Sequence, residues 1–280
     1  MKKTGYGPLL LVLLLMPWVA TAAPSSTQTS TQESFSFGVV PQQNPTALAK
    51  IWAPVLSYLS QKTGYKLEFQ TAKDIATFNQ RLKVGTFDIA YMNPFLYAVD
   101  KSHTYKVFAK EKDTRLRGII VVAKNSPYTR LASLRNTTMA FPDPDAFAAT
   151  LLPLAHLEKA GITVTLKNVM SHDSVYRAVA KGLYPAGGGV IKTLEKTDPF
   201  IRDQLRILWT SPPYIPHPIA AHTRIPQLVI DKLFAAMATM HLDPQGKILL
   251  EELQFKGIEL AEDHEYDAIR ALSNLPAHPQ

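Results

Sequence analysis

Cysteine is absent from this chain of 280 residues. The sequence therefore offers no disulfide, no thiolate nucleophile, no cysteine-ligated metal site and no N-terminal cysteine for lipid attachment. Dense runs of Lys or Arg are also absent, although the formal net charge is +7. A nucleic-acid-binding face needs concentrated basic charge with stacking aromatic residues, so we expect no nucleic-acid partner.

Catalytic motifs are missing as well. The sequence has neither a Gly-x-Ser-x-Gly nucleophile elbow nor a Walker phosphate loop. Its histidines are dispersed, with no pair at metal-ligand spacing on one helix. The segment Glu262-Asp-His-Glu265 is compatible with a metal ion, but a solvated charged turn is the simpler interpretation. We therefore expect no metal site, no cofactor and no enzymatic activity.

Long apolar runs are limited to the N-terminus. Lys2 and Lys3 precede an apolar run over Leu9–Met16, and Ala20-Thr21-Ala22 supplies small residues for cleavage. This pattern predicts a secretory signal peptide over residues 1–22, with an uncleaved anchor as the alternative. Residues 23–34 are rich in Ser, Thr and Gln and predict a disordered leader. We expect a soluble periplasmic protein that is not a lipoprotein.

Strand and helix patterns alternate through the rest of the chain. Residues 35–41, 65–70 and 87–92 have strand patterns, and the intervening stretches around Leu48–Leu59 and Asp74–Lys83 have helical spacing. The alternation resumes from about Ser133 to Thr210. Such βα repeats predict parallel or mixed sheets with helices on both faces.

Two α/β lobes fit this layout. We expect one lobe over residues 35–120 plus 221–276 and the other over residues 121–220, with crossings near Ile119–Ala123 and Pro218–His222. The C-terminal helices would pack on the first lobe. Because neither crossing contains a long flexible linker, the lobes are expected to hinge as rigid bodies around a ligand cleft.

One strand-to-helix turn carries candidate ligand-binding residues. In the segment Gly85–Val99, Asn93 can cap a helix that begins at Pro94. Backbone N–H groups and the positive end of the helix dipole would face outward there. Tyr91, Asn93 and Tyr97 surround the turn. This arrangement indicates either a ligand-facing corner or an ordinary capped helix.

Four segments carry a family resemblance. They are Phe37-Gly-Val-Val-Pro-Gln-Gln43, Phe87-Asp-Ile-Ala-Tyr-Met-Asn-Pro-Phe-Leu-Tyr97, Ala140-Phe-Pro-Asp-Pro144 and Val169-Met-Ser-His-Asp-Ser-Val175. In this order they resemble the phosphate/phosphite/phosphonate-binding proteins of bacterial ABC importers. The resemblance implies a type II periplasmic-binding fold whose two lobes close on a small oxyanion, and an ABC permease as membrane partner.

The resemblance also implies site residues. His172 would reach the bound oxyanion, with Asp173 beside it. Independently of the resemblance, Gln42 follows the first strand and would face the same crevice, because ligands bind at the carboxyl ends of strands. From their residue types, Phe147 and Gly188, in the run Gly187–Gly189, would form an apolar and close-fitting wall of the second lobe, which suits an aromatic or amide-bearing ligand better than a bare oxyanion. The ligand set is completed by Tyr91, Asn93 and Tyr97.

The segment Asp145-Ala-Phe-Ala-Ala-Thr150 departs from the family pattern, in which hydroxyl residues begin the helix. Asp145 is a natural N-cap, which predicts a carboxylate at the place of the ligand's charge and hence an altered specificity. Three alternatives to transport remain open: input to a membrane sensor, an enzyme on the same fold, and a scaffold with an empty cleft. We expect a monomer.

Overall fold

The computed structural model describes residues 1–5, 32–100 and 102–272. The apolar run and cleavage site of the predicted signal peptide, and most of the predicted leader, lie outside these residues. None of the described helices combines the length and the hydropathy that a membrane span requires. Residues from Gln32 onward form one unit, which contains two β-sheets.

The first sheet has six strands in the order β11-β4-β10-β3-β1-β2. Strand β1 pairs in parallel with β2 and β3, whereas β10 is antiparallel to β3 and β4, and β11 is antiparallel to β4. The sheet is therefore mixed, as the sequence predicts. Its strands are β1 Ser34–Val39, β2 Lys66–Gln70, β3 Ile89–Tyr91, β4 Tyr105–Glu111, β10 Pro218–His222 and β11 Ile258–Leu260.

The helices of this half begin at side-chain caps that the sequence signals. Asn44, Asp74 and Asn93 each accept a hydrogen bond from a backbone N–H of the first turn that follows. The helix after Asn44 ends at Gly64, which has a φ of 79° and so adopts the left-handed conformation that favours glycine. These helices are α1 Pro45–Thr63, α2 Ile75–Lys83 and α3 Pro94–Val99.

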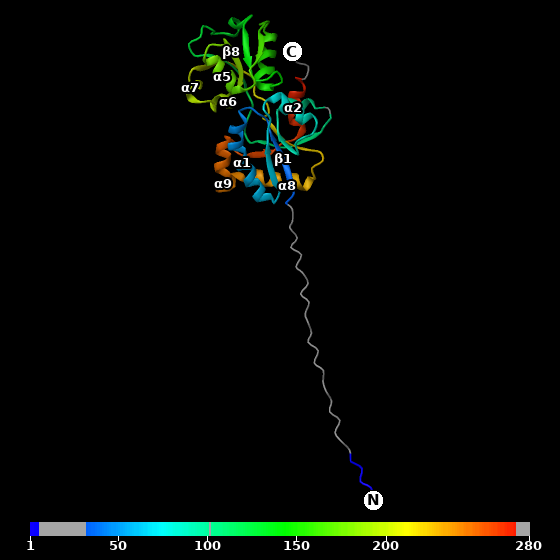
Figure 1. Cartoon of the computed structure of the whole chain (residues 1–280). Helices are drawn as coiled ribbons and strands as arrows, with labels where there is room; N and C mark the ends of the chain where they lie inside the picture. The colour runs from blue at the N-terminus through cyan, green and yellow to red at the C-terminus, as the bar shows by residue number, and fades with distance from the viewer. Residues whose placement is uncertain (6–31, 101, 273–280) are drawn as a thin grey trace. The chain divides into compact units, whose positions relative to one another are not determined.

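The C-terminal helices pack on this first half, as expected. Helices α8 and α9 lie beside α1, and Figure 1 shows the three together. Helix α10 packs against α3. The segment consists of α8 Gln227–Ala238, the 3-10 turn η3 Met240–Leu242, α9 Pro244–Leu253, the 3-10 turn η4 Asp263–Tyr266 and α10 Asp267–Arg270.

The second sheet has five strands in the order β7-β6-β8-β5-β9. Strand β6 is parallel to β7 and β8, and β5 is antiparallel to β8 and β9. Helices α5 and α6 pack against β8, and α7 packs against α5 (Figure 1). The elements are β5 Gly118–Ala123, η1 Leu131–Leu134, β6 Thr138–Phe141, β7 Thr165–Asn168, α5 His172–Ala180, β8 Ala186–Val190, α6 Ile191–Glu195, α7 Pro199–Arg202 and β9 Leu205–Thr210.

The chain passes between the sheets twice, through residues 112–117 and 211–217. These connections touch each other through the bridge between Leu116 and Tyr214. The crossings expected inside residues 119–123 and 218–222 are displaced by a few residues, because β5 belongs wholly to the second sheet and β10 wholly to the first. We accordingly propose that the lobe boundaries lie in the two connections.

The helix expected from Ala146 begins with a π-helical turn, η2 Phe147–Leu151, and continues as α4 Leu152–Lys159. The Leu152 N–H donates to the Phe147 carbonyl, five residues back. Pro153 explains the irregularity. It has no N–H to donate to the Ala149 carbonyl, and its ring crowds that carbonyl in a regular α-helix.

Candidate functional site

Three unpaired backbone N–H groups mark the start of the π-helical turn. The Ala146 N–H donates to the Asp143 carbonyl, and the N–H groups of Thr150 and Leu151 both donate to the Ala146 carbonyl. Between them, the amides of residues 147–149 donate to no acceptor within the described residues. Such N–H groups at the positive end of a helix dipole attract anions.

Two glycines let this turn rest directly on the second sheet. A Cβ atom on Gly118 would lie 2.0 Å from the Ala148 carbonyl oxygen, and one on Gly188 would lie 1.9 Å from the Ala149 oxygen. Both glycines are buried and lie in the neighbouring strands β5 and β8. Gly188 thus supports the turn from behind and is absent from the lining of the cavity that the turn faces.

Asn93 connects the turn to the first half of the chain. Its Nδ2 donates to the Asp145 carbonyl at 3.0 Å, while its Oδ1 accepts from the Phe95 N–H at 2.8 Å. The rings of Phe95 and Phe147 stack beside it, with centroids 5.9 Å apart and planes 5° from parallel. The start of α3 therefore packs against the start of the π-helical turn.

His172 is almost fully enclosed, with 2% of its surface exposed. Ser171 caps α5, because its hydroxyl accepts from the Ser174 N–H at 3.1 Å. The His172 Nδ1 lies 3.3 Å from the Thr193 hydroxyl, which leaves Nε2 for a ligand. Burial lowers the pKa of His172 to about 4, so the imidazole is neutral at pH 7 in the ligand-free protein.

His217 supplies a second buried imidazole. Its Nε2 lies 3.0 Å from Nε2 of Gln42, and its ring stacks on Tyr91 with centroids 5.2 Å apart. Burial lowers the pKa of His217 to about 3, and the neighbouring His172 and Lys192 further disfavour a positive charge on its ring. Gln42 and His217 thereby orient one another on the side of the first sheet.

These groups surround a small inner cavity of about 20 Å³. Residues from both halves line it, including Gln42, Asn93, Phe147, His172 and His217. A space of this size holds about one water-sized group. A tetrahedral oxyanion is larger, so its admission requires the walls to move apart.

An outer chamber of about 430 Å³ lies next to the inner cavity. The two spaces share part of their lining, including Gln42 and His217. The chamber extends past Trp52, Tyr91 and Phe255. Its volume lies within the range of small-molecule binding sites.

Most of the site residues expected from the sequence lie together. Gln42, Asn93, Phe147 and His172 line the inner cavity, and Tyr91 lines the outer chamber. Sequence reasoning missed His217, although its place in the proline-dense connection between the lobes was a usable signal. It also missed Trp52, Phe255 and Lys192, which resemble ordinary core and surface residues in the sequence.

Besides Gly188, two expected residues are absent from the lining of both cavities. The Tyr97 hydroxyl donates to Asp263 Oδ1 at 2.7 Å, and its ring packs on Tyr266 with centroids 4.9 Å apart. Asp173 occupies the first turn of α5 and does not line either cavity. Burial raises the pKa of its carboxyl, an effect that nearby Arg177 opposes.

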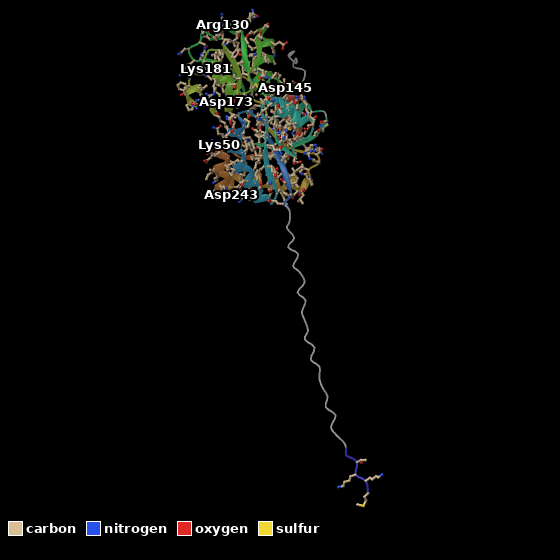
Figure 2. All side chains as sticks on the ribbon, viewed as in Figure 1. Lys50, Arg130, Asp145, Asp173, Lys181 and Asp243 are labelled. Carbon is tan, nitrogen blue, oxygen red and sulfur yellow. The ribbon has the colours of Figure 1, made fainter. Side chains whose placement is uncertain are left out.

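The prediction that Asp145 caps this helix is wrong. Ala146 occupies the N-cap position of the turn and makes no side-chain cap, while Asp145 is exposed (Figure 2). The Asp145 N–H donates to Asp143 Oδ1 at 2.9 Å, so Asp143 organises this Asp-Pro-Asp turn. The Thr150 hydroxyl donates to the Asp143 carbonyl, and Thr150 does not line the inner cavity.

Comparisons with a family profile and with individual proteins point to the same family. Residues 37–266 match the profile of the ABC transporter phosphonate periplasmic substrate-binding proteins. The phosphonates-binding periplasmic protein of Escherichia coli is 23% identical over 86% of this chain and 76% of its own. The phosphate-import protein PhnD of Mycolicibacterium smegmatis is 26% identical over 75% of this chain and 72% of its own.

A solved structure supports the same fold. PhnD1 from Prochlorococcus marinus, in complex with methylphosphonate, superposes with a TM-score of 0.77 at 18% identity, covering 86% of this chain and 97% of that one. The two mixed sheets with their helices thus have the type II periplasmic-binding fold. Because the family profile spans most of the sequence, the chain belongs to the periplasmic substrate-binding proteins of phosphonate ABC transporters.

Proposed function

We propose that this protein binds the tetrahedral head group of a phosphate, phosphite or phosphonate in the inner cavity and presents it to an ABC permease. The observation that carries the proposal is the set of unpaired amides at residues 147–149, which face a cavity also lined by His172. Each amide offers a fixed donor, and the helix dipole adds a positive potential.

The charge around the inner cavity supports an anionic ligand. No carboxylate among the described residues lines this cavity, and Asp145 is exposed. The repulsion expected from a capping Asp145 therefore no longer argues against a phosphorus oxyanion. The His172 Nε2 can accept a hydrogen bond from a protonated ligand oxygen or donate one to an unprotonated oxygen, depending on which imidazole nitrogen carries the proton.

Closure of the two lobes is the proposed mechanism. Asn93, Phe95 and Phe147 connect the halves beside the cavity, so these contacts form only when the lobes are together. A ligand that binds better between closed lobes shifts the hinge equilibrium toward that form. The closed form is then the state that the membrane partner recognises.

The remaining parts of the proposal concern the setting of the protein. We propose that residues 1–22 direct export to the periplasm, that the protein acts as a monomer, and that it releases its ligand unchanged. Use as the input of a membrane sensor is the second candidate, because the same closure would serve a receptor. Ligand turnover would instead indicate an enzyme on this fold.

Calorimetric titration tests the proposal. Phosphate, phosphite and methylphosphonate are titrated into the purified protein, with acetate as a carboxylate control. We expect at least one phosphorus oxyanion to bind in the micromolar range or tighter and acetate not to bind. Absence of binding by all three phosphorus oxyanions would overturn the proposal.

A matched pair of variants locates the binding. His172→Gln removes the imidazole at the cavity and should weaken binding at least tenfold. His156→Gln changes an exposed histidine of α4, which packs on Trp209, and serves as the control. Equal effects of the two substitutions would place the ligand outside the inner cavity.

A further inference from the structure

The outer chamber is too large for the substituent of a simple phosphonate. A head group in the inner cavity, as proposed above, directs whatever is attached to phosphorus toward the adjoining space of about 430 Å³. A methyl group would leave nearly all of that space to water. The residues that line the chamber therefore indicate which substituent the natural ligand carries.

One wall of the chamber is aromatic. The ring of Trp52 lies 5.1 Å from that of Tyr91 and 6.3 Å from that of Phe255, measured between centroids. Tyr91 and Phe255 are 6.1 Å apart, and Tyr91 also stacks on His217. Aromatic clusters of this kind offer faces and edges to another planar ring.

The same wall carries two unused hydrogen-bond donors. Trp52 and Tyr91 are 6% and 8% exposed, yet neither the indole N–H nor the tyrosine hydroxyl bonds to any described residue. Within the described ranges, the side-chain polar atoms that are both inaccessible to solvent and without a hydrogen-bond partner belong to Asn79 and Ser126 only. The two aromatic donors therefore reach open space, and the space they line is the chamber.

The charged groups of the chamber disfavour an amine, because its lining holds four cationic side chains and only two carboxylates, those of Glu111 and the exposed Glu195. Glu111, whose side chain is 5% exposed, already contacts Lys192 at 2.7 and 2.8 Å, and Lys192 lies over the Phe255 ring. Lys196 donates to the Leu253 carbonyl at 3.2 Å and has no carboxylate partner within the described residues. Burial beside Lys192 lowers the pKa of Lys196 to about 8, which an anionic neighbour would reverse.

We infer that the ligand is a phosphonate or phosphate monoester whose substituent is an aromatic ring bearing an acceptor or anionic group. The inference rests on the proposed function, since the phosphorus oxyanion must occupy the inner cavity. The ring packs against the aromatic wall, Tyr91 and Trp52 donate to its acceptor, and Lys196 lies near its negative charge. A phosphonate and a phosphate ester share this chemistry and differ only in the atom attached to phosphorus.

Calorimetry with a graded series of compounds tests the inference. The series is methylphosphonate, 2-aminoethylphosphonate, phenylphosphonate, phenyl phosphate and 4-phosphonobenzoate. We expect phenylphosphonate to bind at least tenfold tighter than methylphosphonate, 4-phosphonobenzoate to bind tighter still, and the aminoethyl compound to gain nothing. The ratio of phenyl phosphate to phenylphosphonate affinity identifies the preferred head group.

The outcomes separate the two proposals. If methylphosphonate binds and the aromatic compounds bind no better, the inference is overturned while the proposed function survives. If no phosphorus compound binds, the proposed function fails and the inference fails with it. Preference for the aminoethyl compound would also overturn the inference.

Variants assign the preference to the chamber. Ile51→Phe, in the chamber lining on α1, should lower the ratio of phenylphosphonate to methylphosphonate affinity at least fivefold. Tyr91→Phe should lower the ratio of 4-phosphonobenzoate to phenylphosphonate affinity at least threefold. Tyr105→Phe, which removes a buried hydroxyl bonded to the Phe87 carbonyl, is the matched control and should change neither ratio. Unchanged ratios in both chamber variants would contradict the inference.

Discussion

Asn93 and Asp145 are 52 residues apart in the chain, yet the Asn93 amide donates to the Asp145 carbonyl at 3.0 Å. Asn93 also caps α3 through its other side-chain atom, which accepts from the Phe95 N–H. One amide side chain thus caps a helix of the first half and contacts Asp145, which lies just before the N-cap residue of the π-helical turn in the second half. This double role ties local helix formation to the geometry of the proposed oxyanion site.

Substitution of Asn93 by Asp separates the two roles. The carboxylate still caps α3 but cannot donate to the Asp145 carbonyl, and it adds negative charge at the inner cavity. We expect affinity for methylphosphonate to fall at least about tenfold, or 1.4 kcal/mol. Asn44→Asp, the same change at the cap of α1, should leave affinity unaltered. Calorimetry on both variants measures the difference. Equal affinities would show that Asn93 does not contribute to ligand binding.

Gly188→Ala tests whether the turn depends on its close contact with β8. The added Cβ would lie 1.9 Å from the Ala149 carbonyl oxygen, so the turn must shift. We expect a loss of about 1–3 kcal/mol in unfolding free energy and a marked loss of affinity. Gly161→Ala, at a φ of 66° with no atom within 4 Å, should destabilise the protein without changing affinity. Urea unfolding and calorimetry together check this, and a normal affinity for Gly188→Ala would contradict the account.

The ion pair between Glu111 and Lys192 joins the end of β4 to α6, and hence the two sheets. A double-mutant cycle with Glu111→Gln and Lys192→Met should show a coupling of at least about 1 kcal/mol in unfolding free energy, because Glu111 is buried. The pair of Lys62 and Asp243, which is more open to solvent, is the control and should show a smaller coupling. A coupling no larger than that of the control would mean that the pair does not hold the halves together.

Acid should destabilise the ligand-free protein through His172. Its pKa is about 4 in the folded state against 6.5 in the unfolded state, so the folded state binds fewer protons in this window. The corresponding stability is fully present above pH 6.5 and is lost as the pH falls toward 4, by about 3 kcal/mol. Asp143 acts in the opposite direction, because burial raises its pKa to about 6.

A comparison of unfolding free energies between pH 4 and 7 isolates the histidine. The wild-type protein should lose stability on acidification by about 3 kcal/mol more than His172→Gln, since both retain Asp143. Parallel pH profiles would show that His172 is not buried in its neutral form.

Much of the fold was predictable because its signals are local. The caps at Asn44, Asp74 and Asn93 each act over two or three residues, and the alternation of strand and helix patterns identifies mixed sheets. The parts of the site that rest on a strand end or a helix start, such as Gln42 and His172, were predictable for the same reason.

The remaining features depend on contacts that are distant in sequence. Tyr97 looked like a site residue, but Asp263, 166 residues later, binds its hydroxyl. Asp145 looked like a cap because N-cap propensity depends only on the residues next to it. The actual geometry also depends on Pro153, which makes the start of the helix π-helical, and on Asn93, which donates to the Asp145 carbonyl. His217 enters the site only because the second crossing runs beside the first.

The most direct test of the central claim is an amide NMR titration of the ¹⁵N-labelled protein with methylphosphonate. The account predicts downfield shifts of the Phe147, Ala148 and Ala149 amide protons, as free N–H groups become hydrogen-bonded to the ligand oxygens, together with a change at the His172 ring. Shifts confined to other regions, or saturation without any change at residues 147–149, would contradict it.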